Sequence, residues 1–248
     1  MIRRQQDGIE WLEFELFAEH PQIAHGIFLK PMSVGISKAE KSHADKCPID
    51  AKENRERIQK ILHADPLISA DQVHGTSMVL IEDQKEEIPH CDGLLTRKAG
   101  LGLMIKHADC QAAIFFDPER KAVANVHCGW RGNVANLYGI AVLEMQKQCG
   151  CRPENILVGI SPSLGPEKAE FIHYRTELPE SFWSYQIKPT YFDLWAISRM
   201  QLENAGILPH HIEVASLCTY SHPQDFFSYR RDNRMTGNHA TVVVLQEV

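Results

Sequence analysis

The sequence has no run of about 18 or more apolar residues, the length that a membrane-spanning helix needs, so we expect no membrane span. Its first residues, MIRRQQDGIEWLEF, have basic side chains but lack the apolar stretch of a signal peptide. Basic residues are not in surplus, since 26 Lys and Arg stand against 32 Asp and Glu, with a net charge of -6. Such a chain has no electrostatic reason to bind nucleic acid or an anionic membrane. We expect a cytoplasmic protein that binds neither nucleic acid nor a membrane.

The seven cysteines show no paired spacing of the kind that a disulfide framework has, and their number is odd. A chain of 248 residues, of which 44% are hydrophobic, can bury a core without cross-links. We therefore predict reduced thiols.

Several catalytic motifs are also absent. The chain has no H-E-x-x-H, no C-x-x-C, no P-loop and no G-x-G-x-x-G, and GISPSLG lacks the spacing of the G-x-S-x-G nucleophile elbow. The paired H-x-E and P-C-x-x-C motifs of zinc nucleobase deaminases are missing. No two of the thirteen histidines are separated by a single residue, so the H-x-H pairs expected of an enzyme with several copper ions are missing as well.

Strand-like and helix-like segments are mixed along the chain, and the strands are more numerous. This order favours one mixed α/β domain over residues 1–248, in preference to a strictly alternating parallel sheet. Runs rich in Val, Ile and Phe predict strands over 22–29, 77–82, 100–107, 112–116, 122–128, 155–161, 212–218 and 240–246.

We predict helices over 53–62, 132–150 and 193–207. The second helix is expected to bury a stripe with Val134, Leu137 and Ala141, and the third to begin at Asp193 as its N-cap. The polar segment 30–52 has no pattern of either kind and is predicted to be a surface loop.

Three short motifs, DQVHGT, HADC and HCGWRG, place metal-capable side chains at the ends of predicted elements. These side chains are His74, Cys110 and His127. Segments 112–116 and 121–127 predict an antiparallel hairpin, and because its two ends lie side by side, Cys110 and His127 can meet. His74 must come from another strand. Two imidazoles and one thiolate suit zinc, and three protein ligands leave a fourth position open, as in catalytic zinc sites.

Other interpretations of these residues remain open. A lone histidine beside a glycine is often only a satisfied polar residue, and a cysteine in an apolar setting is usually a small core residue. Cys128 competes with Cys110, but strand alternation points it away from the face of His127, so we prefer Cys110. His107 is interpreted as a proton carrier, as a residue that contacts a metal ligand but not the metal, or as a buried polar group.

Six motifs, DQVHGT, HADC, HCGWRG, GISPSLGP, CTY and FFSYRRD…TG, occur in this order and together closely resemble one known family. The family was first described as polyphenol oxidase or laccase-like and is now described as purine nucleoside phosphorylase-like. One of its branches is called peptidoglycan editing factor. The resemblance runs from about Ile23 to Val244, nearly the whole chain.

The resemblance implies a single-domain α/β (α+β) fold, a layered sandwich with mixed β-sheets and flanking helices. It also implies a zinc ion held by His74, Cys110 and His127. It implies phosphorolysis of adenosine and inosine, action on methylthioadenosine and hydrolytic deamination of adenosine. The expected partners are therefore a purine nucleoside and phosphate, and copper is the less favoured metal.

Each reaction needs further groups. Deamination requires an acid or base near C6 of the purine, and His107 and Asp109 are the candidates. Phosphorolysis requires cationic donors for phosphate, ideally a guanidinium, and Arg131 and Arg230 are the candidates. For Arg231 we prefer a surface salt bridge.

The chain departs from the family pattern in its loops. The usual T-R-x-G-G stretch reads FLKPMSVG here, with Lys30 in place of the arginine, and the S-L-N-L element that follows it is missing. The family's T-G-R stretch reads TGN here and ends in Asn238. HADC stands where the family usually has T-A-D-C. The resemblance therefore predicts the metal ligands better than the substrate.

Two other functions are kept as alternatives. One is copper-dependent phenol oxidation, against which the absence of H-x-H pairs argues. The other is a non-enzymatic protein that binds or edits a peptidoglycan precursor in the same pocket. We expect a monomer in either case.

Overall fold

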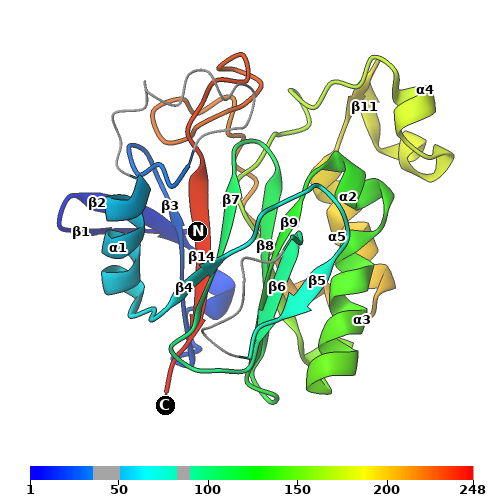
Figure 1. The fold of residues 1–248 in the computed structure, drawn as a ribbon. Coiled ribbons are helices and arrows are strands. Elements are labelled where there is room, and N and C mark those ends of the chain that lie inside the picture. Colours follow the sequence, from blue (N-terminus) through cyan, green and yellow to red (C-terminus); the bar gives the residue numbers. More distant parts are fainter. Residues whose placement is uncertain (36–50, 83–89, 248) are drawn as a thin grey trace.

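Two packed β-sheets form the centre of the computed structural model, which describes residues 1–35, 51–82 and 90–247 (Figure 1). The first sheet has the order β1 (Ile2–Gln6), β2 (Ile9–Glu13), β3 (Ile23–Phe28), β14 (His239–Leu245), β7 (Gly102–His107) and β4 (Leu67–Ser69). The second has the order β13 (Ile212–Val214), β10 (Leu157–Ile160), β8 (Gln111–Asp117), β9 (Ala122–Cys128), β6 (Gly93–Thr96) and β5 (Met78–Leu80). A small third sheet pairs β11 (Gln186–Lys188) with β12 (Tyr191–Phe192).

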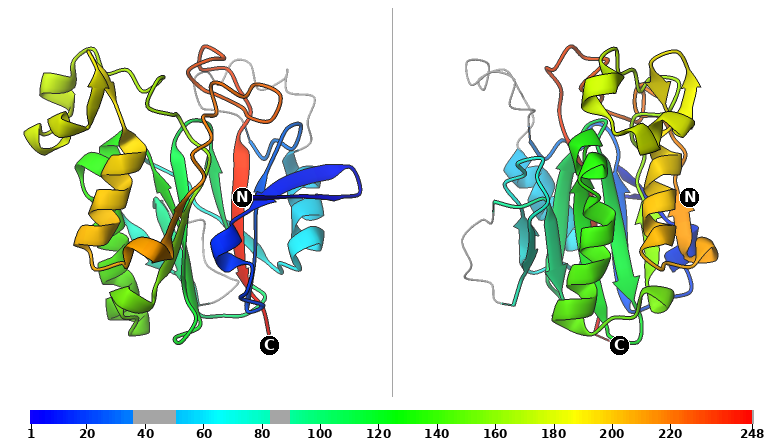
Figure 2. Two further views of the ribbon diagram at one scale, coloured as in Figure 1. Left: turned by 180° about the vertical axis from the view of Figure 1, so that it is seen from behind. Right: turned by 90° about the vertical axis from the view of Figure 1, so that its right-hand side faces the viewer.

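Helices cover the outer faces of both sheets. One helix, α1, lies against the first sheet, and α3 and α5 lie side by side against the second (Figure 2). The α-helices are α1 (Ala51–Leu62), α2 (Trp130–Val134), α3 (Leu137–Cys149), α4 (Tyr174–Glu177) and α5 (Leu194–Asn204). Short 3-10 helices span Glu15–Phe17, Pro153–Asn155, Glu180–Tyr185 and Pro209–His211. The layer order of helix, sheet, sheet and helices confirms the predicted sandwich.

Side chains from alternate positions of both sheets fill the space between them. Leu103 of β7 and Val243 of β14 pack in one cluster with Ile114 and Phe116 of β8, and all four are fully buried. Burying one such side chain contributes about 1.5–3 kcal/mol. This apolar layer fixes the position of one sheet relative to the other. The strand ends beyond the layer are therefore held in fixed positions.

The intervening residues face the helices. Phe115 of β8 packs with Tyr138 of α3, and Met104 of β7 packs with Ile58 of α1. Because both faces of the central strands are covered, β8 and β9 are buried at every position. This explains why their sequences read as continuous apolar runs and not as alternating ones.

The predicted helix over 132–150 was wrong, because two helices, α2 and α3, occupy that region. Asn136 lies between them with a φ of 56°, a left-handed conformation that asparagine tolerates better than most residues. Leu137 and Ala141 are buried as predicted, but Val134 precedes the break and is exposed. Apolar periodicity continues across the break, so it does not reveal one left-handed residue.

The third predicted helix has the ends that its sequence indicates. The Asp193 side chain accepts a hydrogen bond from the Ala196 amide at 2.9 Å, which makes it the N-cap of α5. Gly206 follows the helix with a φ of 95°. Each predicted strand is also present, though mostly shorter, whereas six further strands were not predicted: β1, β2, β4, β6, β11 and β12. The predicted loop over 30–52 falls mostly outside the described residues, and Ala51 begins α1.

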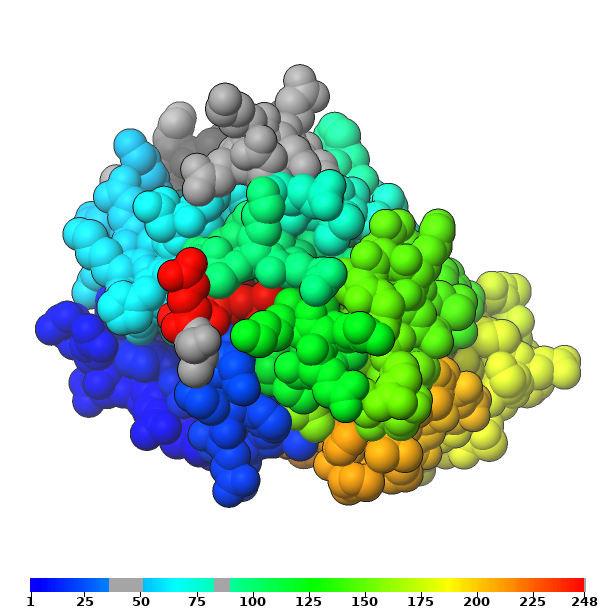
Figure 3. All heavy atoms as spheres, turned by 90° about the horizontal axis from the view of Figure 1, so that it is seen from below, coloured from blue at the N-terminus to red at the C-terminus, as the bar shows by residue number. Residues whose placement is uncertain are grey.

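Neither end of the described chain lies among the loops at the top of Figure 1. The last residues of the chain, drawn in red, lie near the middle of the lower face (Figure 3). Among the described residues, every helix is too short or too polar to span a bilayer.

We expect Asp193→Ala to lower the free energy of unfolding by about 1 kcal/mol, because the first turn of α5 loses its cap. Asp193→Asn is the matched control, since its amide oxygen still accepts from the Ala196 amide. Urea denaturation of both variants measures the difference. Equal stability of the two variants would contradict the capping role.

Candidate metal centre and active site

A cavity of about 850 Å³ is lined by residues of both sheets, with His107 at the end of β7, Gln111 at the start of β8 and His127 near the end of β9. Two of its walls come from connections that cross between the sheets, β4 to β5 and β7 to β8. The side chains that the sequence singled out all line this cavity: His74, His107, Asp109, Cys110, His127, Arg131 and Arg230. The tertiary structure thus brings together residues that are spread over more than half of the chain.

His74, Cys110 and His127 form a compact group in the cavity wall, which we call the ligand group. One ligand atom from each lies within 4.8 Å of the other two, and the rings of His74 and His127 are nearly perpendicular with centroids 4.8 Å apart. The hairpin argument accounts for two of them, because the β8–β9 register pairs Ala112 with His127, and Cys110 lies two residues before Ala112. His74 approaches from the β4–β5 connection, with a φ of 59°. One thiolate and two imidazoles at this spacing fit a single metal ion.

The charges of Cys110 and His127 depend on each other. Burial alone would raise the pKa of Cys110, but the charge of His127 and hydrogen bonds with His127 and His74 lower it to about 6. Burial would lower the pKa of His127, but the Cys110 thiolate and the Asp92 carboxylate raise it to about 9. At neutral pH the sulfur is therefore a thiolate, the form that binds metal ions.

Asp92, at the start of β6, holds two of the three ligands and was missed in the sequence. Its fully buried carboxylate accepts a hydrogen bond from Nδ1 of His127 at 2.8 Å and from the amides of His74 at 2.9 Å and Gly75 at 2.6 Å. Burial would raise the pKa of Asp92, but the hydrogen bonds from His127 and Gly75 outweigh this effect and lower it. With Nδ1 as the donor, Nε2 of His127 is left for a metal ion.

Gly129 provides space beside the ligands. A Cβ at this position would lie 3.2 Å from Sγ of Cys110 and 3.3 Å from a ring carbon of His74. Any other residue would therefore press on two ligands at once. The first glycine of HCGWRG thus lets the backbone approach the ligand group closely.

Cys128, the competing cysteine, points away from this group. It belongs to the apolar cluster beneath α3, and burial raises its pKa well above the usual value, to a level at which the thiol stays protonated. Strand alternation along β9 thus separates it from His127, as the sequence predicts.

The Asp109 carboxylate is occupied by hydrogen bonds. Oδ1 accepts from the Thr219 hydroxyl at 2.6 Å, and Oδ2 accepts from the Ser228 hydroxyl at 3.0 Å and the Arg230 amide at 2.7 Å. Asp109 has a φ of 83° and directly precedes Cys110. It therefore ties two loops at the cavity rim to the segment that carries a metal-capable thiolate.

His107 is the more available of the two predicted proton carriers. Its ring is 2% exposed and lines the cavity, and Nε2 lies 2.8 Å from the Thr241 hydroxyl. Burial lowers its pKa well below the usual value, and the nearby His239 and His127 lower it further. His107 is therefore neutral at neutral pH.

The two predicted phosphate contacts differ in how they are held. The Arg131 guanidinium stacks on Trp130, with Cζ 4.1 Å from the ring centroid, and Trp130 in turn contacts Phe171 edge-on. The Arg230 guanidinium donates to the carbonyls of Lys168 at 2.9 Å and Glu170 at 3.2 Å. Arg230 therefore fastens the rim segments, whereas the Arg131 side chain is exposed. The guanidinium of Arg231 pairs with Asp232 at 2.8 Å.

Other lining residues were also missed. Arg55 of α1, Glu170 and Glu177 also line the cavity. None of the three lies in a motif that the sequence analysis used, and only the fold brings them near the ligand group. For Asp92 a local signal exists, since an acidic residue directly precedes the apolar run GLL.

We expect Asp92→Asn to lower the affinity for zinc about 10- to 100-fold. This is the usual effect when a metal-ligating histidine loses its hydrogen-bond partner. The amide keeps one acceptor for His127 but turns a donor toward the amide of Gly75. Asp117→Asn is the control, because Asp117 is an equally buried aspartate that caps the β8–β9 turn away from the cavity. Competition titrations with a chelating dye measure both affinities, and wild-type affinity in Asp92→Asn would contradict the role.

Comparison with known proteins places the chain in a family. A family model described as multi-copper polyphenol oxidoreductase laccase matches residues 39–246. A purine nucleoside phosphorylase of Bacteroides thetaiotaomicron is 30% identical over 246 residues, 89% of this chain and 90% of that protein. Purine nucleoside phosphorylase YlmD of Geobacillus stearothermophilus is 32% identical over 209 residues, 76% of each protein. The solved structure of YlmD from Geobacillus stearothermophilus has a TM-score of 0.83 and 27% identity, with 99% of both chains covered. The chain therefore belongs to the multi-copper polyphenol oxidoreductase laccase family.

Proposed function

We propose that this protein is a zinc-dependent purine nucleoside phosphorylase that acts on adenosine, inosine and methylthioadenosine. The observation that carries the proposal is the convergence of His74, Cys110 and His127 in the wall of a cavity of about 850 Å³. A cavity of this size can hold a nucleoside together with phosphate. The name that the relatives share, purine nucleoside phosphorylase, supports the same class of reaction.

Zinc is favoured over copper by the donor set. In the part of the chain that the structure describes, one group of three metal-capable side chains is close enough to share an ion, and it offers two imidazoles and a thiolate. An oxidase with several copper ions needs more histidines at close range. Zinc bound by this group would supply a Lewis acid next to the substrate.

The apolar wall of the cavity is suited to a purine ring. Trp130, Phe171 and Leu194 line it, and an aromatic face can stack on the base. Glu170 and Glu177 line the same wall and offer carboxylate oxygens to the ribose hydroxyls or to purine N–H groups. These five side chains would position the nucleoside.

Phosphorolysis then needs an anion on the other face of the ribose. A phosphate oxygen forms a bond to C1′ while the bond from C1′ to N9 breaks, and the purine leaves with the electron pair and takes up a proton. Cationic side chains lower the cost of bringing phosphate into the cavity. Arg131 is a candidate with an exposed guanidinium, and Arg230 holds the rim through its contacts with Lys168 and Glu170.

We further propose that the same site deaminates adenosine. Water adds at C6 and ammonia leaves, so one group must take a proton from the water and return one to the nitrogen. The neutral, buried His107 is favoured for this transfer. Asp109 is favoured as a positioning residue, because three donors already occupy its carboxylate.

We also propose that the protein is cytoplasmic, because its seven cysteines lack paired spacing, and that it is a monomer formed by one domain over residues 1–248.

We expect the purified protein, given inosine and phosphate, to release equal amounts of hypoxanthine and ribose 1-phosphate and to contain zinc. Cys110→Ser should lose the metal and lower kcat/KM at least about 100-fold, because the thiolate ligand is gone. Cys218→Ser is the matched control, since a serine oxygen can still accept from the Gly165 amide. Copper content with phenol oxidation, or nucleoside binding without turnover, would contradict the proposal.

Variants of the two proton-carrier candidates should behave differently. His107→Gln should lower adenosine deamination about 100-fold or more, the usual contribution of a proton-transfer group, and affect inosine phosphorolysis much less. Asp109→Asn should lower both activities by a similar factor, because it loosens the rim that both substrates contact. Product assays with each nucleoside measure both effects. Normal deamination rates in both variants would remove these residues from the mechanism.

A further inference from the structure

One end of the large cavity carries a positive charge that no carboxylate of the described residues balances. Arg55, in the second turn of α1, lines this cavity and also an adjoining one of about 390 Å³. Its guanidinium donates from Nε and Nη2 to a single acceptor, the Val34 carbonyl, at 3.3 and 2.9 Å. Asp71, an acidic residue that lines both cavities, directs its Oδ2 to Nδ1 of His90 at 3.0 Å.

Arg55 is half-buried, so its charge is partly removed from water. Burial lowers its pKa, and no neighbouring carboxylate offsets that effect. An arginine nevertheless stays protonated in proteins, so the charge persists and its burial costs free energy. An anion bound in the cavity would offset this cost, and the planar guanidinium can give two parallel hydrogen bonds to a phosphate.

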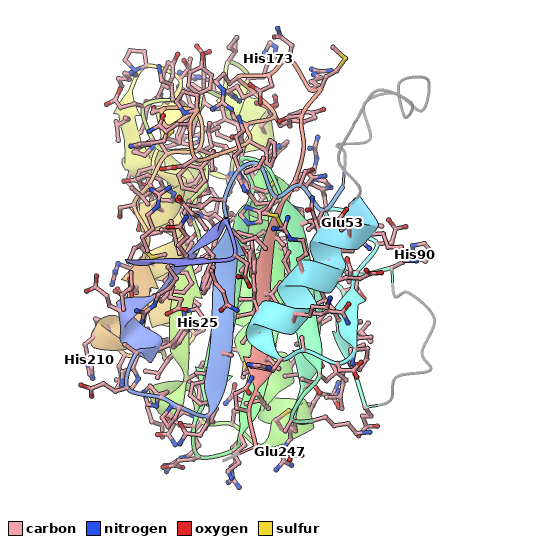
Figure 4. The ribbon with its side chains drawn as sticks, turned by 90° about the vertical axis from the view of Figure 1, so that its left-hand side faces the viewer. His25, Glu53, His90, His173, His210 and Glu247 are labelled. Carbon is pink, nitrogen blue, oxygen red and sulfur yellow. The ribbon has the colours of Figure 1, made fainter. Side chains whose placement is uncertain are left out.

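The backbone around Arg55 holds its side chain in place. Asn54 is buried and donates to the Ser33 carbonyl at 2.8 Å, directly before the Val34 carbonyl that Arg55 contacts. Ile58 packs the helix onto the first sheet. Figure 4 shows the first turn of α1, marked by Glu53, toward the same end of the molecule as His173, which lines the large cavity. The guanidinium is therefore positioned before any ligand binds.

The two ends of the cavity differ in chemistry. The end with Arg55 is built by α1 and the first sheet, and Lys106 and Asn238 also line it. The other end is built by α2 and residues 161–194, with Trp130 and Phe171 as its aromatic wall and two carboxylates beside them. The ligand group lies between these ends, since His74 and Cys110 lie on connections that join the two sheets.

We propose that Arg55 forms the anion subsite of this cavity and binds inorganic phosphate, while the purine lies at the aromatic end beyond the ligand group. The aromatic end also has two arginines, but Arg131 stacks on Trp130 and Arg230 donates to the carbonyls of Lys168 and Glu170. Glu170 and Glu177 line the same end and disfavour a dianion there, so Arg55 replaces Arg131 as the phosphate contact. The identity of the anion rests on the proposed phosphorolysis, whereas the existence of an anion site rests on Arg55 alone.

The test compares two arginines of the same helix. Arg57 lies two residues from Arg55, donates to the Asp7 carbonyl at 3.2 Å and lines neither cavity. Arg55→Gln should raise the KM for phosphate about 10- to 100-fold and leave the KM for inosine nearly unchanged, as expected for the loss of a charged hydrogen-bond donor. Arg55→Lys should have a smaller effect, because it keeps the charge and loses the paired donors. Arg57→Gln removes the same charge and should change neither KM.

Phosphate binding is also measured without turnover, as the rise in melting temperature with increasing inorganic phosphate against chloride at equal ionic strength. The wild type and Arg57→Gln should be stabilised, and Arg55→Gln should not. If phosphate stabilises the wild type through Arg55 but no phosphorolysis occurs, the proposed function fails and the anion site stands. The inference is overturned if phosphate does not stabilise the wild type, or if Arg55→Gln responds like Arg57→Gln. A raised phosphate KM in Arg131→Gln but not in Arg55→Gln would place the anion at the aromatic end.

Discussion

The hydrogen bond between the Asp92 carboxylate and the His127 ring is the interaction on which the candidate site depends. It joins the start of β6 to the end of β9, and the same carboxylate accepts the amides of His74 and Gly75. A buried carboxylate is stable only when its oxygens are paired, so this group holds both imidazoles in one orientation. Cys110 then completes the group from the neighbouring turn.

The cavity has two chemically different ends because each sheet contributes its own surroundings. The helix on the first sheet provides Arg55, and the segment before α5 on the second sheet provides an aromatic wall with Phe171. The ligand group lies on the connections between the sheets, where both ends are within reach. Asp109 and Arg230 bind the rim segments to one another, so the cavity keeps its shape through hydrogen bonds among loops.

Local patterns predict the parts of this protein that depend on neighbouring residues. The Asp193 cap and the β8–β9 hairpin were predicted because their hydrogen bonds join residues close in sequence. The hairpin also explains why Cys110 and His127 meet. The break at Asn136 could not be predicted, since a single left-handed residue leaves the apolar pattern intact. Arg55 was missed because its place in the cavity depends on the fold. Asp92 was missed because an acidic residue before the run GLL does not by itself indicate which side chains it contacts.

The sequence by itself determined the mixture of strands and helices, the three metal-capable side chains and the net charge of -6, because apolar runs, residue types and charge can be taken directly from it. The sandwich of mixed sheets was predicted from the order of six motifs that resemble one family. Only the tertiary structure decided that His74 reaches the hairpin, that Asp109 is occupied by Thr219, and that Arg55 faces the cavity without an acidic partner among the described residues. These facts depend on how two sheets stack and where their connections cross. The sheets stack because the whole apolar layer between them becomes buried. The residues of that layer come from many segments, so no short motif reveals it.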